Sequence, residues 1–182
     1  MTRARDLASA SPTPTTVSST ELGYLDGVTS AIQTQFTGKA ATTGATISTP
    51  ILVSPEERMT VSATAATGTI QFDSDTQGAL YYTTSASADW TLNVRGSSGT
   101  TLSSKLAVGD AITVAFLATT GATAYKHSAL TVDGAAQTVK WSGGTAPAAG
   151  NASSIDAYSF TIIKTAATPT YTVLGAGPVK YA

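Results

Sequence analysis

Apolar and polar residues alternate with a period of two along most of the chain from Thr69 onward. Such alternation puts every second side chain on the same face of a β-strand, so each run predicts a strand with one buried and one solvated face. Turn-forming Gly, Ser, Asn and Asp residues separate roughly eight or nine runs. Their apolar members are Ile70, Phe72, Leu80, Tyr82, Trp90, Leu92, Val94, Ile112, Val114, Phe116, Leu130, Val132, Val139, Trp141, Tyr158, Phe160, Ile162, Tyr171 and Val173. The pattern predicts a mainly β fold.

The connections between these runs indicate how the strands are arranged. Asp133 and Gly134 stand between the runs that contain Val132 and Val139, and Asp-Gly between alternating runs is a strong hairpin signal. Short strands separated by turn residues are typical of antiparallel sandwiches. We therefore expect residues 69–182 to form one antiparallel, jelly-roll-like β-sandwich, which is long enough to bury a single core.

The chain carries little charge. Charged residues make up 12% of the 182 residues and the formal net charge is −1. Proteins that bind nucleic acid through charge need a basic surface, so this balance excludes such a partner. Cysteine is absent and histidine occurs once, which excludes disulfides, thiolate metal sites and histidine-rich sites. We expect no metal and no cofactor.

The carboxylates are few and scattered. Asp73 and Asp75 lie two positions apart and share one face of a strand, where they form either an acid–base pair or simply the solvated end of the strand. Glycoside hydrolysis needs two facing carboxylates, and the sequence offers no convincing pair. No nucleophile elbow accompanies His127. We predict no catalytic residues and no enzyme, with a glycan hydrolase as the alternative.

The first part of the chain is rich in proline. Pro12 and Pro14 hold an extended backbone that cannot join the interior of a sheet, so residues 1–17 are expected to be an arm that orders only along a partner. Arg3 and Arg5 make this arm basic and are the candidates for anchoring it to an acidic surface. The arm has no apolar stretch of the kind that secretory signals carry, so we expect synthesis in the cytoplasm without a Sec-type export route.

Residues 18–37 have the features of a short helix. Ser18 and Glu21 have the spacing of a capping box, which is a helix start signal. An apolar stripe with coiled-coil spacing follows and is formed by Leu22, Leu25, Ile32 and Phe36. The stripe either covers the chain's own domain or packs on copies of itself around an axis. We favour the second arrangement, a homotrimer. Residues 38–68 are then an extended neck with at most one short strand, at Ile51, Leu52 and Val53 and continuing through Met59 and Val61.

Two parts of the sequence resemble proteins of tailed bacteriophages. The segment VSSTELGYLDGVTSAIQTQ at residues 17–35 resembles a repeat of phage fibre proteins, especially those of cyanophages and other marine phages. The segments GALYYTT at 78–84, ADWTLNVRG at 88–96, KWSGGTAPAAGNASSID at 140–156 and FTIIKT at 160–165 resemble a fibre-tip module of such phages.

The resemblance implies a virion structural protein, typically homotrimeric, that contacts the host surface at its distal end. We expect a short tail fibre whose N-terminal arm attaches to other virion proteins. Its C-terminal sandwich then contacts a host surface glycan or an outer-membrane component. A capsid decoration or head-fibre protein without receptor binding is the alternative.

Loops carry recognition on scaffolds of this kind. The longest turn-rich loops are expected at residues 97–104, 119–128 and 142–153. The large side chains in or beside them are Tyr125, Lys126, His127 and Trp141, which can stack on a sugar or donate hydrogen bonds to it. His127 is expected in a surface loop, and Trp141 either contacts a receptor or packs against the core.

Overall fold

The protein is described by a computed structural model that covers Thr20, Ser54 and residues 56–182. Residues 54–182 form one compact unit. Its elements in chain order are β1 (Met59–Ala65), β2 (Gly68–Asp73), β3 (Ala79–Thr84), β4 (Trp90–Arg95), α4 (Leu102–Lys105), β5 (Ala111–Thr119), β6 (His127–Val132), β7 (Ala135–Gln137), β8 (Val139–Trp141), η1 (Ser142–Gly144), β9 (Ile155–Ala166) and β10 (Thr170–Tyr181). The predicted mainly β fold is confirmed.

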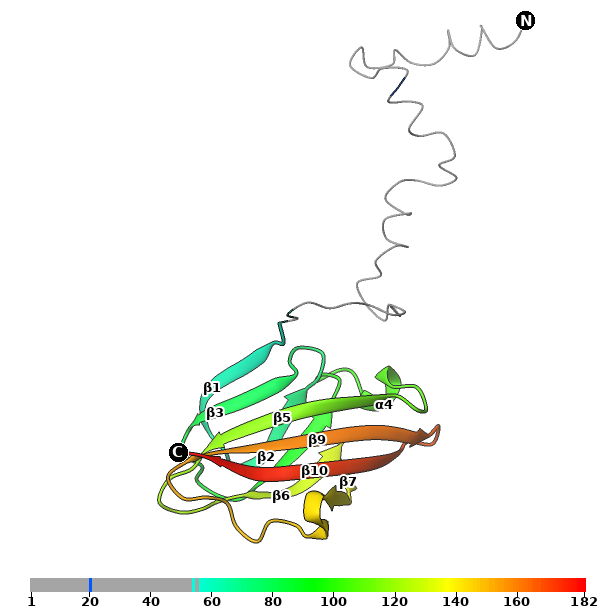
Figure 1. Ribbon diagram of the computed structural model, residues 1–182. Helices are drawn as coiled ribbons and strands as arrows, with labels where there is room; N and C mark the ends of the chain where they lie inside the picture. The colour runs from blue at the N-terminus through cyan, green and yellow to red at the C-terminus, as the bar shows by residue number, and fades with distance from the viewer. Residues whose placement is uncertain (1–19, 21–53, 55) are drawn as a thin grey trace, which may run out of the picture. The chain divides into compact units, whose positions relative to one another are not determined.

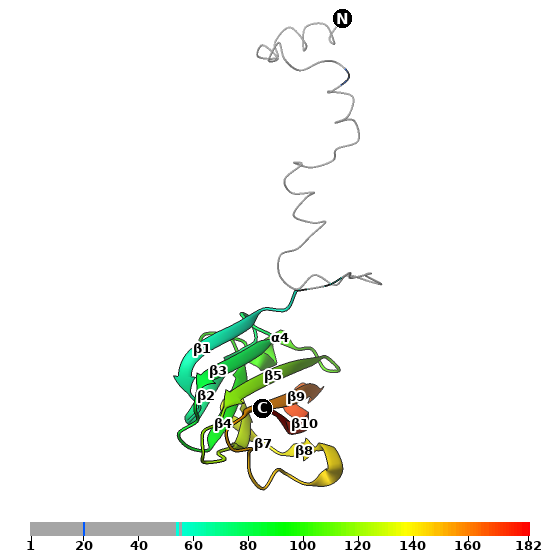
Figure 2. The same cartoon turned by 60° about the vertical axis from the view of Figure 1, so that its left-hand side comes forward.

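The strands form two sheets that face each other (Figures 1 and 2). One sheet has six strands in the order β1-β3-β5-β9-β10-β8, and the other has four in the order β2-β4-β6-β7. From β1 to β6 the chain changes sheet after every strand. When the chain returns to a sheet, the new strand runs parallel to the previous strand of that same sheet. β1, β3 and β5 are therefore mutually parallel, and so are β2, β4 and β6.

The expected all-antiparallel, jelly-roll-like arrangement is therefore wrong for this half of the domain. Antiparallel pairing is confined to β5 with β9, β9 with β10, and β6 with β7, while β8 lies parallel to β10. The physical reason is that side chains alternate with a period of two in parallel and antiparallel sheets alike. The alternation that predicts a strand carries no information about the direction of its neighbour.

The hairpin at Asp133 and Gly134 is confirmed, but its second strand is a different one. Both residues have positive φ, 51° and 82°, as the tight turns of two-residue hairpins require. The turn pairs Val132 with Ala135, so the strand that returns is the short β7. The run at Val139 and Trp141 crosses to the six-stranded sheet instead, where it forms β8 beside β10.

The core lies between the two sheets and is built from the predicted apolar phases. Trp90 is at its centre, fully buried, with its ring edge-on to Phe116 at 5.7 Å and to Tyr158 at 5.9 Å. Tyr82, Ile112, Val139, Trp141 and Tyr171 are half-buried against this cluster, and the other predicted apolar members are buried. Every inward-facing residue of the sequence analysis therefore packs in or against one core.

The folded unit begins earlier than expected. β1, which the sequence analysis assigned to the neck, pairs with β3 as the edge strand of the six-stranded sheet. The expected boundary at residue 69 therefore falls inside the sandwich. The expected arm at 1–17, the helix at 18–37 and the neck up to residue 53 lie outside the described residues, apart from Thr20.

Candidate functional site

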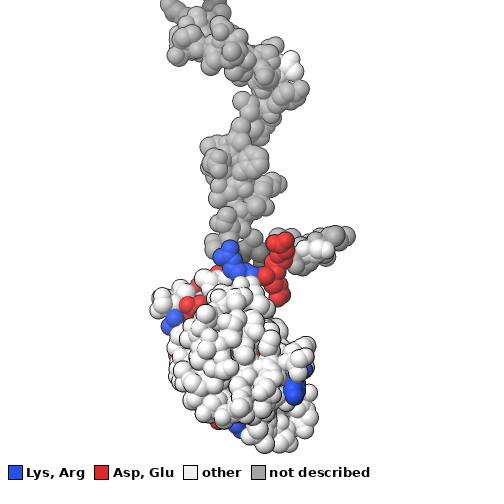
Figure 3. All heavy atoms as spheres, turned by 90° about the vertical axis from the view of Figure 1, so that its left-hand side faces the viewer, with Lys and Arg blue, Asp and Glu red and all other residues white. Residues whose placement is uncertain are grey.

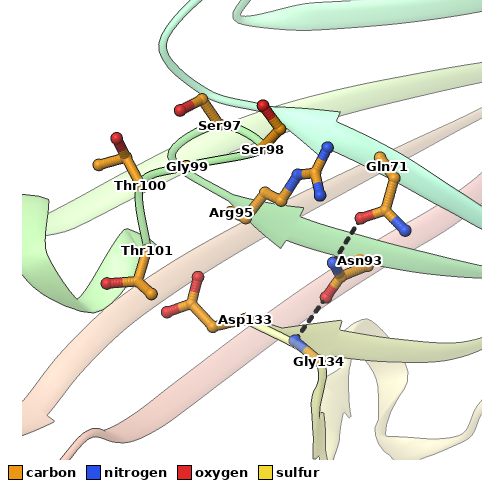
Figure 4. Close-up of a pocket in the computed structure, with 10 residues that line it drawn as sticks. All are labelled: Gln71, Asn93, Arg95, Ser97, Ser98, Gly99, Thr100, Thr101, Asp133 and Gly134. Atoms are coloured by element: carbon orange, nitrogen blue, oxygen red, sulfur yellow. Dashed lines mark hydrogen bonds between the residues drawn. The ribbon is translucent and has the colours of Figure 1, made fainter.

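A polar pocket of about 390 Å³ lies on the solvent side of the four-stranded sheet (Figure 4). The outward phases of β2 and β4 form its floor, and the loop after β4 and the turn between β6 and β7 form its walls. Its lining residues are Gln71, Asn93, Arg95, Ser97, Ser98, Gly99, Thr100, Thr101, Asp133 and Gly134. All ten are polar residues or glycine.

Asn93 holds the floor of the pocket together. Its side-chain amide donates to Gln71 Oε1 at 2.6 Å, and its carbonyl oxygen accepts from the backbone N–H of Gly134 at 2.8 Å and from the Thr131 hydroxyl at 2.7 Å. Asn93 is only 7% exposed. One side chain therefore connects β2, β4 and β6 across their parallel registers and fixes the β6–β7 turn against the sheet.

Two ion pairs stand beside the pocket. Arg95 Nε donates to Asp73 Oδ1 at 2.6 Å, and this hydrogen bond to the carboxylate raises the pKa of Arg95 above its usual value. Lys105 pairs with Asp75. Each carboxylate therefore faces a cationic side chain and not the other carboxylate. This supports the interpretation of Asp73 and Asp75 as the solvated end of a strand.

The loop that walls the pocket is closely packed at its base. Ser97 and Thr100 exchange backbone hydrogen bonds at 2.9 and 3.4 Å. A Cβ atom on Gly96 would lie 2.8 Å from the Thr100 carbonyl oxygen, so glycine is required for this close approach. The single helical turn α4 follows, with Thr101 as its N-cap accepting from the Ser104 amide at 3.1 Å. These contacts hold the hydroxyl-bearing loop in one shape.

A second notable surface is the six-strand face, defined here as the solvent-facing side of the six-stranded sheet. An apolar row crosses it from β1 to β10, formed by Val61, Tyr81, Leu117, Ala157 and Val179, which are successive partners in the strand registers. Among the strands of this sheet, Asp156, Lys164 and Lys180 share the phase of the inward side chains. This leaves Lys140 as the only charged residue in the outward phase of these strands.

The six-strand face also exposes large hydrophobic side chains. Within the described part of the chain, six large hydrophobic residues are exposed, and all except Val108 lie on β1 or β10: Met59, Val61, Leu174, Val179 and Tyr181. Hollows of about 380 and 370 Å³ lie on the same face, one beside Leu174 and the other beside Tyr81 and Tyr181. Figure 3, a view from the side where β1 and the C-terminus lie in Figure 1, shows few charged atoms across the middle of the surface.

The proposed receptor residues lie together at the β8–β9 loop, but they make internal contacts. Lys126 donates from Nζ to the carbonyl oxygens of Pro147 and Ala148 at 2.8 and 2.9 Å, and its backbone N–H donates to Asp89. Tyr125 is half-buried against the core. Lys126 therefore fixes the long loop that follows β8, and part of its hydrogen-bonding capacity is used within the protein.

His127 is not a surface loop residue, and that expectation is wrong. It begins β6 and is 3% exposed, with its ring 4.8 Å from the ring of Phe160 and 5.8 Å from those of Tyr158 and Trp141. Burial in this apolar cluster lowers the pKa of His127 to about 4. Strict alternation back from the inward Leu130 and Val132 would place position 127 on the outward side of β6. An irregularity in the register, where Trp90 pairs with His127 but Thr91 pairs with Ala129, turns the His127 ring inward instead.

Trp141 has the packing role that the sequence left open. It is half-buried, and its ring meets Phe160 edge-on at 5.8 Å. Part of the ring also borders the hollow beside Leu174. Trp141 therefore covers the end of the core, with one side towards solvent.

The remaining candidate groups do not form a reactive cluster. Asp156 is fully buried and accepts from the backbone and side-chain amides of Asn151, both at 2.8 Å, so it orders the loop before β9. Among the described residues, no group of three or more His, Asp or Glu side chains is placed to hold a metal. In the same part of the chain, no helix is long and apolar enough to cross a membrane. The residues of the expected trimer stripe (Leu22, Leu25, Ile32, Phe36) and of the anchor (Arg3, Arg5) lie outside the described residues.

Comparisons with protein-family models, with curated proteins and with solved structures find no match for this chain. The site must therefore be judged on its own geometry.

The sequence analysis missed the pocket. Gln71, Asn93 and Arg95 occupy the outward phase of β2 and β4, whereas the alternation predicts only the inward phase as core. Three polar residues at alternate positions of two runs were a visible signal, but only the parallel register of β2 and β4 places Gln71 opposite Asn93 and Asp73 opposite Arg95.

Proposed function

We propose that this protein is a structural subunit of a bacteriophage virion, a short trimeric tail fibre. In this proposal the N-terminal segment attaches to other virion proteins and the sandwich faces the host surface. Support comes from the sequence resemblance at residues 17–35 and from one structural observation. That observation is the six-strand face, which carries an apolar row among threonine and serine side chains and is nearly free of charge.

The composition of the six-strand face supports assembly with copies of the same chain. Solvated faces of sheets are normally polar, and extended apolar patches mark interaction surfaces. Identical faces repel each other when they carry net charge, and this one carries only Lys140 in its outward phase. Val61 and Val179, which are 63% and 52% exposed, stand at the two ends of the apolar row. Contact between copies would remove these side chains from water.

The edge of the sheet adds a second reason for association. Among the strands of residues 56–182, none lies on the outer side of β1, so a row of its backbone donors and acceptors has no partner strand there. Monomeric proteins usually protect such edges with charged residues or proline, and the β1 sequence MTVSATA has neither. An exposed, uncharged edge next to a face with an apolar row fits a subunit that is completed by its neighbours.

The test is the mass of the full chain in solution, measured by size-exclusion chromatography with light scattering. We expect three times the 18.3 kDa of one chain. Val61→Lys places a charge at the end of the apolar row and should shift the population towards smaller species. Thr69→Lys is the matched control, because Thr69 is exposed on β2, the edge strand of the other sheet.

A monomeric wild-type chain would overturn the proposal. A trimer that Val61→Lys and Thr69→Lys leave equally intact would overturn the role of the six-strand face in assembly. Labelling the protein on purified phage particles and imaging them then decides between tail and head. Label on the capsid shell would favour the decoration protein over the fibre.

A further inference from the structure

We propose that the polar pocket over β2 and β4 is a binding site for a single neutral saccharide unit. The inference deepens the proposed function, because a surface glycan is the receptor class expected there. The pocket and the six-strand face lie on opposite sheets of the sandwich. Assembly through the six-strand face would therefore leave the pocket open to solvent.

The hydrogen-bond network fixes which groups Gln71 presents. The backbone N–H of Gly134 is always a donor, so the atom of Asn93 that faces it at 2.8 Å must be the side-chain oxygen. The amide nitrogen of Asn93 therefore points to Gln71, which receives it through Oε1 at 2.6 Å. Gln71 is left with its NH₂ group, a pair of donors, for a ligand.

Arg95 and the loop hydroxyls supply the other free groups. Arg95 is held by Asp73 through Nε at 2.6 Å and through Nη2 at 3.5 Å. These bonds fix the guanidinium plane and leave further N–H donors of the group, which has five in total. Ser97, Ser98 and Thr100 add hydroxyls, each able to donate and to accept. The pocket thus combines fixed donors with adaptable hydroxyls, as in Figure 4.

The balance of charge favours a neutral ligand over an anion. The positive charge of Arg95 is matched by Asp73, and the Asp133 carboxylate lies in the wall of the same pocket. A carboxylate or sulfate group on a sugar would meet two negative groups for one positive group. The hydroxyls of a neutral sugar both donate and accept, which suits a mixed lining of this kind.

The pocket is pre-organised. Asn93 is buried, and both its side-chain amide and its carbonyl oxygen make hydrogen bonds within the protein. Arg95 is held by two hydrogen bonds to Asp73, and Gly96 packs closely against Thr100 at the base of the loop. A ligand therefore does not have to order these side chains, and this lowers the entropy cost of binding. None of the ten lining residues is aromatic, so the stacking that strengthens many sugar sites is missing. We expect weak binding by each site, with several copies on one particle supplying avidity.

The test is an amide chemical-shift titration of the full chain by NMR. The probes are the methyl glycosides of glucose, galactose and mannose, with methyl glucuronide and inorganic sulfate as the anionic probes. We expect at least one neutral glycoside to shift the Gln71 side-chain amide and the backbone amides of Ser97–Thr100 in a saturable manner. Weaker or absent shifts with the anionic probes are expected in the same samples.

The decisive variant is Gln71→Glu. It keeps an oxygen for the Asn93 amide but replaces the donors that face the pocket with an acceptor, so we expect affinity for the glycoside to fall about tenfold, the equivalent of one hydrogen bond. Gln137→Glu makes the same change on β7 of the same sheet, outside the pocket, and should leave affinity unchanged. Ser98→Ala, at an exposed hydroxyl of the loop, should weaken binding by a smaller factor.

Three results would overturn the saccharide site: no saturable shift with any neutral glycoside, stronger binding of glucuronide or sulfate than of the neutral sugars, or equal affinity of Gln71→Glu and Gln137→Glu. The oligomeric mass of each sample is measured alongside. If the protein is a trimer that binds no sugar, the saccharide site is contradicted and the assembly proposal stands. If it is a monomer that binds sugar, the saccharide site stands and the assembly proposal is contradicted.

Discussion

The Asp133 carboxylate accepts a hydrogen bond from the backbone amide of Leu102 at 2.7 Å, although the two residues are 31 positions apart. Its other oxygen accepts from the amide of Ser103 at 3.0 Å. These two amides belong to the first turn of α4, where backbone donors have no partner within the helix. The tight turn after β6 thereby holds the wall of the polar pocket in place.

Asp133→Asn should destabilise the sandwich by about 1–2 kcal/mol. Asparagine tolerates the positive φ of this turn, so the backbone can stay as it is. It has one acceptor oxygen, however, and its NH₂ group would face one of the two amides. Chemical denaturation followed by circular dichroism measures the loss. Asp75→Asn, which removes a surface ion pair, should cost less than about 1 kcal/mol, and equal losses for the two variants would contradict the capping role.

Lys164→Met should lower the free energy of unfolding by about 2 kcal/mol. Lys164 is 7% exposed and donates from Nζ to the carbonyl oxygens of Ser103 and Leu106 at 2.6 and 2.9 Å. Methionine retains most of the apolar stem but leaves both carbonyls without this donor. The same denaturation experiment applies. Lys180→Met, at an exposed position of β10, should be close to neutral, and a neutral Lys164→Met would show that the buried ammonium contributes nothing.

The stability of the sandwich should fall on mild acidification because of His127. Burial lowers its pKa from 6.5 to about 4, so between these values the unfolded chain binds a proton that the folded chain does not. The stabilising effect is therefore fully present above about pH 6.5 and is lost as the pH falls towards about 4. Unfolding free energies measured at about pH 7 and about pH 5 should differ by about 2 kcal/mol from this group.

His127→Phe isolates this effect, because phenylalanine fits an aromatic cluster and does not titrate. The variant should lose the part of the pH dependence between about pH 7 and about pH 5 that His127 causes, while carboxylates still act at lower pH. If wild type and variant lose stability in parallel over this range, His127 is not the group responsible.

Trp141→Ala should cost about 2–3 kcal/mol of stability, less than the usual loss for a fully buried tryptophan. The ring packs edge-on against Phe160 and His127, but it is only half-buried. Trp90→Ala, at the fully buried centre of the core, is the comparison and should cost about 3–5 kcal/mol. A Trp141→Ala variant as stable as wild type would return this residue to the list of receptor contacts.

The N-terminal stripe gives an independent prediction for assembly. Ile32→Asp should convert the trimer into monomers or insoluble material, because the stripe is expected to pack on copies of itself. Light scattering measures the change, and a soluble, unaltered trimer would rule out the coiled coil. Together with Val61→Lys, the variant separates assembly through the N-terminal segment from assembly through the six-strand face.

Burial of individual residues was well predicted from the sequence wherever the alternation was continuous. Trp90, Leu92 and Val94 are buried as their phase requires. His127 is the exception, because alternation from Leu130 and Val132 would place it on the outward side, and a bulge between His127 and Ala129 reverses this. A local irregularity of the strand pairing, which the alternation does not reveal, decided the burial of this residue.

The sequence by itself determined which side chains face the core, because alternation with a period of two sets the two faces of any strand. The position of the Asp133–Gly134 turn was also determined locally, since it depends on the backbone freedom of those two residues. Only the tertiary structure decided which strands are neighbours and in which direction they run. It places Gln71 beside Asn93 and brings Lys164 to the carbonyl of Ser103, 61 residues earlier in the chain. These pairs depend on the path of the chain between two sheets, and that path is set by the packing of the whole core.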